Sequence, residues 1–461
     1  MKSLIERFDR FLDRHFSTEL FSHREIFSMW VPLILDAFFI NAISMLSTSM
    51  VSSSGQESIA AVSMINPVGY LLICGFNAIA TGGTVVVAQY KGAGDEEDVS
   101  RASGQTIFFT MLITLVLSIP FIVFASPITR FFYSGAEEIV LSKAATYLAG
   151  TGISIIPYAF YMAVFSIFRG LGETKLCLRL TIYINLSFFI FCIIFINIMK
   201  LDVLGSALAY ILARLLGAVV AGIYLFVTKK DAVVVKARHM FRLDKNIIGS
   251  MLKISLPFGF EQFIMQGGSL LVQKYMVILG TEMMAANAIA NSVLMIIYAL
   301  PQAVGNLVAA VIGRCIGAGR KDDATKYGKS LMGLGTASLV LSIIVFLPLM
   351  PLILPIYNPG EAITPIIYKI LFVSVIPLIF AWPMSNIAPN ILRSAGDATY
   401  ASVISLIAMW IFRVAAGYIV AIPLGFGITG VWICIILEWV FRALLYGGRI
   451  KRGKWLLKKA I

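Results

Sequence analysis

The chain has 461 residues, of which 59% are hydrophobic and 13% are charged, and its formal net charge is +13. Soluble domains are about 45–50% apolar and about 25% charged, so a soluble fold could not cover this much apolar surface. The composition predicts a polytopic membrane protein and excludes a disordered or secreted one. The basic balance indicates no nucleic-acid partner, because positive charge retained in cytoplasmic loops gives a membrane protein the same excess.

The predicted elements begin with an amphipathic segment, residues 1–27, which either lies as a helix on the membrane surface or forms a solvated tail. Beyond it, apolar runs of about 20 residues recur, each long enough to cross a ~30 Å hydrocarbon core as a helix. These runs predict an all-α integral membrane fold with twelve transmembrane helices, near 28–52, 62–88, 105–126, 138–168, 177–199, 204–228, 250–279, 286–312, 331–355, 364–389, 400–422 and 428–447.

Lysine and arginine are divided unequally between the loops that these spans create. With the N-terminus inside, the cytoplasmic segments hold 29 of them, the external loops four and the spans another four. Because cytoplasmic loops carry the excess of basic residues, we expect both termini on the cytoplasmic side of the plasma (inner) membrane. Residues 229–249 are then a cytoplasmic linker, and residues 448–461 a basic cytoplasmic tail.

The sequence is internally duplicated. Pro32, Gly55 and Asp98 recur as the same residue types 225 positions later without a gap, and the motif at 169–174 recurs at 393–398, one residue out of phase. Internal duplication in a transporter-sized chain indicates two structurally related halves.

Each half contains an even number of spans, so both halves enter the membrane from the same side. A pseudo-two-fold axis along the membrane normal then relates them. We predict two pseudo-symmetric six-helix lobes, 28–228 and 250–447, facing a cleft whose mouth opens to either side of the membrane.

Two acids occupy repeat-related places inside the spans. Asp36 follows Pro32 by four residues, and its counterpart 225 positions later is Glu261. Ionisable groups within the bilayer are costly and mark functional sites by default, so we predict that these acids exchange H+ for a cation, or bind Na+ near Asp36. The alternative is that both acids, about two turns into their spans, contact water or cap a neighbouring helix.

Polar residues repeat in the second and eighth spans. Asn66 and Asn77 are eleven residues apart and therefore share one helical face, and Asn291 and Gln302 repeat that spacing. These stripes are predicted to line the substrate cleft. The alternative is hydrogen bonding between neighbouring helices.

Aromatic side chains provide a second set of cleft candidates. Tyr158, Tyr161 and Trp382 lie within predicted spans, where an aromatic face attracts an organic cation. The alternative for these residues is simple space filling.

Charged residues in the last two spans suggest a structural cluster. Glu438 and Arg442 are one helical turn apart, which is the spacing of an ion pair, and Arg413 is placed to join them. Arg214 and Lys274 also lie within spans, where they either snorkel towards the interface or pair with another group.

Motifs for enzymes, nucleotides and metals fail in context. Residues 425–430 spell G-x-G-x-x-G but join two spans, outside the βαβ unit that a dinucleotide site requires. The five cysteines show no Cys-x-x-Cys spacing, and the three histidines fall in polar segments. We therefore predict no catalytic residue, no metal site and no cofactor. The chain is not an enzyme, and an ion gradient supplies its energy.

Several motifs together resemble the multidrug and toxic compound extrusion (MATE) family over about residues 28–455. They are the loops Gly92–Gly94 and Gly317–Gly319, the opening of the fifth span at Arg169–Lys175, the segment Met409–Arg413, and Gly427–Trp432 running into Glu438-Trp439 and Arg442-Ala443.

The resemblance implies two six-helix lobes in a V shape that rock to export cationic amphipathic compounds against entering H+ or Na+. Many members of the family carry an Asp followed by Thr late in the first span, and these positions are Ser47 and Thr48 here. Asn185 matches an Asn of the family's fifth span. Ser47 and Asn185 therefore join Asp36 and Glu261 as candidate ion-coupling residues.

The leading hypothesis is a secondary antiporter for small organic cations or amphiphiles, acting as a monomer among membrane lipids. The alternative is a flippase for a lipid-linked oligosaccharide from the same superfamily, whose cleft would be lined by more basic residues than this chain supplies.

Overall fold

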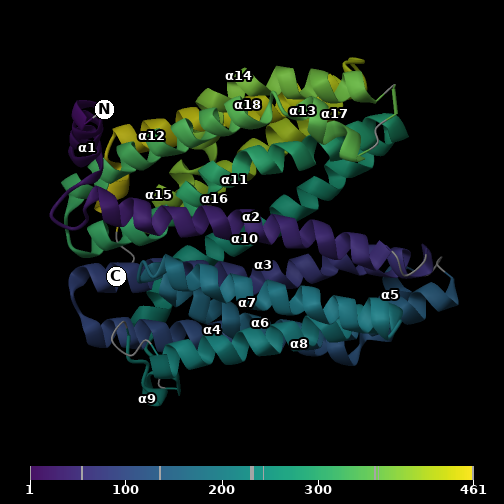
Figure 1. Ribbon diagram of the computed structural model, residues 1–461, viewed down its shortest axis with the longest axis horizontal. Helices are drawn as coiled ribbons and strands as arrows, with labels where there is room; N and C mark the ends of the chain where they lie inside the picture. Colours follow the sequence, from purple (N-terminus) through teal and green to yellow (C-terminus); the bar gives the residue numbers. More distant parts are fainter. Residues whose placement is uncertain are drawn as a thin grey trace. The chain divides into compact units, whose positions relative to one another are not determined.

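The computed structural model describes residues 2–52, 56–133, 137–228, 233–241, 243–357, 360–361, 363–458 and 461. The side chains of residues 2–5, 8, 41–52, 56–60, 237, 241 and 356 lie outside this description. Every regular element in the described ranges is a helix (Figure 1). The all-α fold class predicted from the sequence is confirmed.

Helices occupy each of the first six predicted spans. They are α2 (His23–Ser52), α3 (Gln56–Ala93), α4 (Glu96–Val123), α6 (Glu138–Gly170), α7 (Thr174–Cys192) continued by the π-helical η1 (Ile193–Ile198), and α8 (Asp202–Ile223) continued by the π-helical η2 (Tyr224–Thr228). Three shorter helices accompany them: α1 (Lys2–Phe16), α5 (Ala125–Phe132) and α9 (Ala237–Phe241).

Helices also occupy the last six predicted spans. They are α10 (Lys245–Ile278), α11 (Thr281–Gly317), α12 (Lys321–Phe346) followed by α13 (Met350–Ile353) and η3 (Leu354–Tyr357), α14 (Thr364–Asn386) with α15 (Ala388–Ser394), α16 (Ala398–Ala408) continued by the π-helical η4 (Met409–Ala416) and α17 (Gly417–Ala421), and α18 (Gly427–Lys451). A short turn, η5 (Lys454–Leu457), follows.

Length and hydropathy indicate which of these helices can cross a membrane. Among the described residues, ten helical stretches are long and apolar enough. The helices α2 and α10, at 30 and 34 residues, occupy the remaining two predicted spans. At 1.5 Å per residue, each is longer than the ~30 Å thickness of a hydrocarbon core.

Exposed apolar stripes on the outer helices indicate contact with lipid. Phe372, Ile376 and Phe380 of α14 are 62%, 68% and 78% exposed, and their spacing of four residues places them on one helical face. A soluble protein rarely exposes such a stripe, whereas hydrocarbon solvates it without cost.

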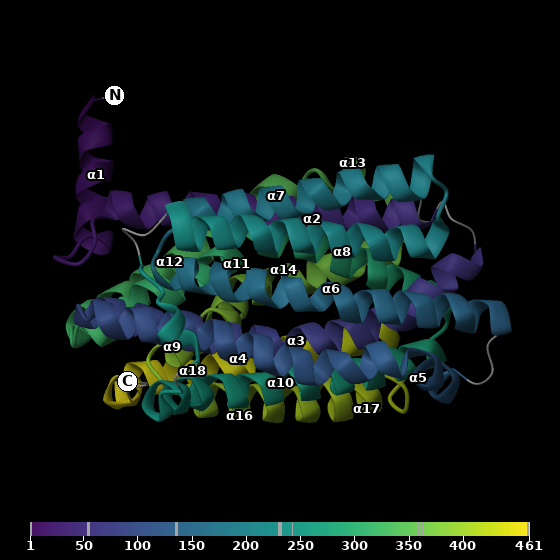
Figure 2. The same ribbon diagram turned by 90° about the horizontal axis from the view of Figure 1, so that it is seen from below.

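The helices pack into two compact units. The N-unit comprises Leu35–Gly259 with Ile461, and the C-unit comprises Met1–Ile34 and Phe260–Ala460. Within the N-unit, α6 packs on α3, α4 and α8, and within the C-unit, α11 packs on α12 and α14, and α14 on α18 (Figures 1 and 2). The lobe boundaries expected at 28–228 and 250–447 stay a prediction.

Two helices belong to both units. The division falls after Ile34 within α2 and after Gly259 within α10. These two positions are 225 residues apart, which is the offset of the internal repeat. The two division points therefore fall at the same place in the repeated sequence.

The repeat also recurs in the turns that end helices. Gly94 and Gly319 follow α3 and α11 with φ of 79° and 71°, and Gly172 and Gly396 follow α6 and α15 with φ of 76° and 91°. Glycine occupies this left-handed region without the clash that a Cβ introduces. The repeated glycines thus reverse the chain at equivalent points of the two halves.

The N-terminal segment is docked on the C-unit. The helix α1 packs against α12, and the connection to α2 is held by three α12 side chains: Ser330 Oγ donates to His15 O at 2.6 Å, Lys326 Nζ to Ser17 O at 2.7 Å, and Tyr327 Oη to Phe21 O at 2.9 Å. These bonds fix the start of α2, the helix that carries Asp36. Contact of α1 with the membrane surface stays a prediction.

Candidate functional site

Asp36 is the buried acid of the N-unit. Its carboxylate accepts a hydrogen bond from the Thr181 hydroxyl of α7, and the Arg169 guanidinium of α6 is near enough to act on it electrostatically. No ion pair joins Asp36 to Arg169, although the structure describes both side chains. The Oδ1 atom of Asp36 is buried and has no hydrogen-bond partner in the described part of the chain. A buried carboxylate oxygen in this state is able to hold a proton or to contact a cation.

Asn185 lies one helical turn beyond Thr181. Its Nδ2 atom donates to the Thr181 carbonyl oxygen at 2.9 Å. The structure therefore brings Asn185 close to the hydroxyl that binds Asp36. The third predicted ion-coupling residue of this half, Ser47, is part of α2, but its side chain lies outside the described residues.

Two tyrosines extend from Asp36 towards Arg214. Tyr161 is buried, and its Oη atom is 3.4 Å from Thr181 Oγ1. Its ring stacks on Tyr158 with centroids 5.8 Å apart, and the Arg214 guanidinium lies over the Tyr158 ring, 4.5 Å from its centroid. Tyr158, one of the predicted cation-binding aromatics, thus contacts a cation supplied by the protein itself.

Arg214 stands near the middle of its span. It lies 12 residues, or ~18 Å, after the start of α8, in a helical stretch of 27 residues. A cation at the centre of a span costs about 2.5–3.5 kcal/mol on insertion scales. The rings of Tyr158 and Tyr210, at 4.5 and 4.7 Å, offset part of this cost, since a cation–π contact contributes about 0.5–2 kcal/mol.

A cavity of about 240 Å³ opens beside Arg214. Three helices supply its walls. The lining residues are Ile65, Asn66, Gly69, Tyr70 and Ile73 of α3, Tyr147 and Thr151 of α6, and Tyr210 and Arg214 of α8. Asn66, a predicted cleft residue, therefore does line a cavity of the N-unit.

Glu261 is the buried acid of the C-unit. Its Oε2 atom accepts a hydrogen bond from Arg393 Nη2 at 2.6 Å, in an ion pair with both side chains buried. Arg393 also donates through Nη1 to Asn390 Oδ1 at 3.1 Å. The Glu261 carboxylate is thus ion-paired with a permanent positive charge, whereas the Asp36 carboxylate forms no ion pair with the described residues.

A second group of charges in the C-unit is centred on Glu438, which is 0% exposed. Arg413 Nε donates to its Oε2 atom at 2.7 Å, and Arg442 Nη1 to its Oε1 atom at 3.3 Å. Arg442 Nη2 also donates to the Ser385 carbonyl oxygen at 3.0 Å. These bonds connect α18 with η4 and α14.

The remaining predicted cleft residues are dispersed. Asn77 of α3 has a buried Oδ1 without a hydrogen-bond partner among the described residues. In the C-unit, Asn291 donates to the Asn287 carbonyl of its own helix at 2.9 Å, Gln302 is exposed, and buried Trp382 stacks on Tyr298 with centroids 4.8 Å apart.

Sequence reasoning missed the partners of the two acids. Arg169, Thr181 and Arg393 were not singled out as site residues, yet they surround Asp36 and Glu261. The signal was available, because Arg169 and Arg393 open the same repeated motif, as Asp36 and Glu261 occupy the same repeated position. Each half therefore brings one arginine near its acid, and only in the C-unit do the two form an ion pair among the described residues.

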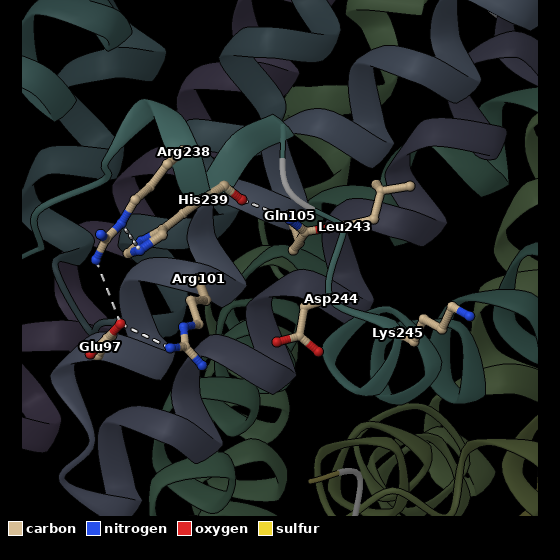
Figure 3. Close-up of a pocket in the computed structure, with 8 residues that line it drawn as sticks. All are labelled: Glu97, Arg101, Gln105, Arg238, His239, Leu243, Asp244 and Lys245. Atoms are coloured by element: carbon tan, nitrogen blue, oxygen red, sulfur yellow. Dashed lines mark hydrogen bonds and ion pairs between the residues drawn. The ribbon is translucent and has the colours of Figure 1, made fainter.

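A larger cavity, about 500 Å³, lies beside the linker that precedes α10 (Figure 3). Arg238 and His239 of α9 approach α4 there: Arg238 Nε donates to His239 Nε2 at 3.1 Å, and His239 Nδ1 is 2.8 Å from Ser100 Oγ. Gln105 Nε2 donates to the His239 carbonyl oxygen at 2.7 Å. Burial, and then the charge of Arg238, lowers the pKa of His239. These contacts anchor the linker to α4.

Comparisons with known proteins identify the class. The MatE family model matches residues 32–197 and 257–419. The two matches begin at Pro32 and Pro257, which are separated by the offset of the internal repeat. The chain belongs to the MATE family of membrane transporters, and it is a multi-pass membrane protein.

Relatives and solved structures agree with this assignment. The uncharacterized transporter YisQ of Bacillus subtilis is 27% identical over 443 residues, covering 94% of this chain and 95% of the relative. The probable multidrug resistance protein NorM of Oceanobacillus iheyensis is 23% identical, covering 88% and 91%. The crystal structure of a MATE protein in complex with MaL6 matches with a TM-score of 0.87 at 18% identity, covering 93% and 96%. This last likeness confirms the MATE fold.

Proposed function

We propose that the protein is a secondary active antiporter that exports cationic or amphipathic organic compounds in exchange for H+ or Na+. The observation that carries this proposal is the buried Asp36 carboxylate, whose Oδ1 atom has no hydrogen-bond partner among the described residues. The names of the relatives, which refer to multidrug resistance, support the substrate class. They give no support to the flippase alternative.

Burial makes Asp36 suited to ion exchange. An ionised carboxylate removed from water costs several kcal/mol unless its charge is compensated. A proton or a bound cation removes this cost. When neither is bound, the Thr181 hydroxyl and the nearby Arg169 charge stabilise the ionised Asp36 carboxylate. In this proposal Asp36 alternates between a state with a bound proton or cation and a charged state, as an exchanger requires. One carboxylate and one hydroxyl suit a proton better than a metal cation.

Glu261 has a different role in this proposal. Its ion pair with Arg393 compensates its charge, and loss of that negative charge would leave Arg393 buried and uncompensated. We assign Glu261 to positioning α10, and we assign coupling to Asp36 with Thr181 and Asn185 as its supports.

Rocking of two lobes is the proposed movement. The prolines Pro32 and Pro257 lie two residues before the points where α2 and α10 pass from one unit to the other. A proline removes a helical hydrogen bond and allows the helix to bend. Asp36 follows the first bend closely, so a change in its charge acts on the segment that must flex.

The surroundings of the transporter follow from the charge pattern. We propose the plasma (inner) membrane as its location, with both termini cytoplasmic, because 29 basic residues fall on that side. We propose that it acts as a monomer on small organic substrates.

Transport measurements on proteoliposomes test the coupling. Uptake of an organic cation is measured first with a pH gradient alone and then with a Na+ gradient alone. We expect Asp36→Asn to lower gradient-driven uptake at least tenfold while leaving equilibrium binding of the substrate within about threefold. Full gradient-driven uptake by Asp36→Asn would overturn the assignment of the coupling site.

The matched control is Glu261→Gln, the equivalent change in the other half. We expect it to lower the thermal stability of the purified protein, with the surviving folded fraction still coupled to the gradient. If Glu261→Gln were stable and uncoupled while Asp36→Asn stayed coupled, the roles of the two acids would be reversed.

A further inference from the structure

Arg214 is a cation without an acidic partner. Its Nη1 atom donates to Ser154 Oγ at 2.7 Å, and its guanidinium plane contacts the rings of Tyr158 and Tyr210. No ion pair connects it to a carboxylate anywhere in the described part of the chain. This distinguishes it from Arg413 and Arg442, which share Glu438.

The guanidinium retains capacity for a ligand. Arginine carries five N–H donors, and among the described residues Arg214 makes one hydrogen bond, to Ser154. The rings of Tyr158 and Tyr210 contact the guanidinium through their faces, which accept no N–H···O hydrogen bond, so these contacts leave its other donors for a ligand. A carboxylate accepts two parallel hydrogen bonds from such an edge.

The neighbouring cavity has the polarity that an anion requires. Its walls offer hydroxyl and amide groups from Tyr70, Tyr147, Thr151 and Asn66 beside the guanidinium of Arg214, and none of the described lining residues is acidic. The rest of the lining is aliphatic or aromatic. Hydrogen-bond donors around a single positive charge in a largely apolar wall select an anionic group attached to an apolar body.

The size of the cavity limits how much of a ligand it holds. At about 240 Å³, it is smaller than the roughly 300–1,000 Å³ of drug-sized sites. It therefore accommodates one end of an amphipathic molecule. Access exists at α3, where Asn66 and Tyr70 are both exposed.

We propose that Arg214 is a specificity-determining residue of this cavity and binds the carboxylate of an amphipathic substrate. This inference rests on the proposed transport function and adds one binding residue to it. The contacts from Arg214 through Tyr158 and Tyr161 to Thr181 connect the proposed anion site with the hydroxyl that binds Asp36.

Binding to the purified protein tests the proposal with two dyes that differ in one group. Tetramethylrhodamine with a free carboxylate and its methyl ester share the same cationic ring system, and fluorescence anisotropy gives the Kd of each. We expect the wild-type protein to bind the free acid about tenfold more tightly than the ester, which is ~1.4 kcal/mol. Equal affinities for the two dyes in the wild-type protein would overturn the proposal.

Substitutions of Arg214 assign the preference to that residue. Arg214→Gln is expected to abolish the tenfold preference while leaving the affinity for the ester within about twofold. Arg214→Lys keeps the positive charge beneath the tyrosines but lacks the bidentate fork, so we expect a preference of about threefold. Because it preserves the charge, this variant decides the question even if Arg214→Gln fails to fold.

Arg130→Gln is the matched control, since it removes the same charge from an exposed arginine of α5 that is ion-paired with Glu138. It should bind both dyes as the wild-type protein does. If Arg214→Gln weakened both dyes equally, the residue would support the fold of the cavity instead of the carboxylate, and the proposal would fail.

Equilibrium binding keeps this inference separate from the proposed function. Loss of gradient-driven uptake with an intact preference for the free acid would contradict antiport alone. Gradient-driven uptake of both dyes with equal affinity would contradict the carboxylate site alone.

Discussion

Each of the two units contains a buried acid in a membrane helix, but the groups around the two acids differ. In the C-unit, Glu261 forms a closed ion pair with Arg393 at 2.6 Å. In the N-unit, Asp36 occupies the equivalent position of the repeat, but it accepts a hydrogen bond from Thr181 and feels Arg169 only at a distance. The comparison shows that a duplicated sequence places an acid and an arginine in both halves, while the described residues join them in an ion pair only in the C-unit.

The largest expected effect is the loss of stability when Arg393, and not Arg169, is replaced. Arg393→Gln should lower the free energy of unfolding by about 3–5 kcal/mol, because it leaves the buried Glu261 charge unpaired. Arg169→Gln should cost clearly less, since no ion pair is broken. Thermal unfolding of the detergent-purified proteins measures both.

The double variant Glu261→Gln with Arg393→Gln serves as the control. It removes both charges together, so it should recover much of the stability lost in Arg393→Gln. Equal losses from Arg393→Gln and Arg169→Gln would show that the two acids are held in the same way, and the comparison would break.

The next effect concerns the hydroxyl that binds Asp36. Thr181→Val keeps the shape of the side chain but removes the donor, and hydrogen bonds to charged groups contribute about 1.5–3 kcal/mol. We expect the initial rate of gradient-driven uptake to fall about tenfold, with Thr181→Ser restoring most of it. Uptake by Thr181→Val at the wild-type rate would show that transport does not depend on the hydrogen bond from Thr181 to the ionised Asp36 carboxylate.

A smaller pair of expected effects concerns two glycine turns at which the units have the same backbone conformation. Gly94→Ala and Gly319→Ala introduce a Cβ at repeat-related turns with positive φ and open space around them. Each should cost about 1–2 kcal/mol of stability from backbone strain alone. If one substitution cost a stability within this range and the other fell outside it, the two turns would not be equivalent.

Gly249→Ala is the control for these turns. Gly249 lies inside α10, and a Cβ there also meets open space. Because its backbone is helical, alanine should stabilise the protein by about 0.5–1 kcal/mol.

The smallest effect concerns the linker side of the N-unit. Burial lowers the pKa of His239, helped by the charges of Arg238, Lys236 and Arg101 and opposed by Glu97. The unfolded chain therefore takes up a proton on this histidine at higher pH than the folded protein does, so stability falls as the pH drops below about 6.5.

Melting temperatures at about pH 7.5 and about pH 5.5 measure this effect. We expect the decrease on acidification to be smaller in His239→Gln than in the wild-type protein. An unchanged decrease would assign the pH dependence to other groups.

Much of the architecture was predictable because it depends on local sequence. Apolar runs of sufficient length must form helices in a bilayer, since no water satisfies their backbone groups. The glycines at 94, 172, 319 and 396 were recognisable through the repeat, and each adopts the positive φ that ends a helix. The spacing of Glu438 and Arg442 by one turn likewise indicated their contact.

The sites were less predictable because they combine residues far apart in the chain. Asp36 was found from its rarity in an apolar span, but its partner Thr181 is 145 positions away and is one of many hydroxyl residues. Tyr158 was predicted to face an organic cation, whereas the packing of α6 against α8 places Arg214 over its ring. Neither contact has a signature in local spacing.

The sequence by itself determined a duplicated, all-helical membrane protein with one acid at the same place in each half, because hydropathy, charge and repeat offset are properties of the chain. Only the tertiary structure decided that, among the described residues, Glu261 forms an ion pair and Asp36 does not, and that Arg214 lines a cavity whose described residues include no acid. The physical reason is that the free energy of a buried charge depends on which groups lie within a few ångströms of it, and packing alone sets those distances.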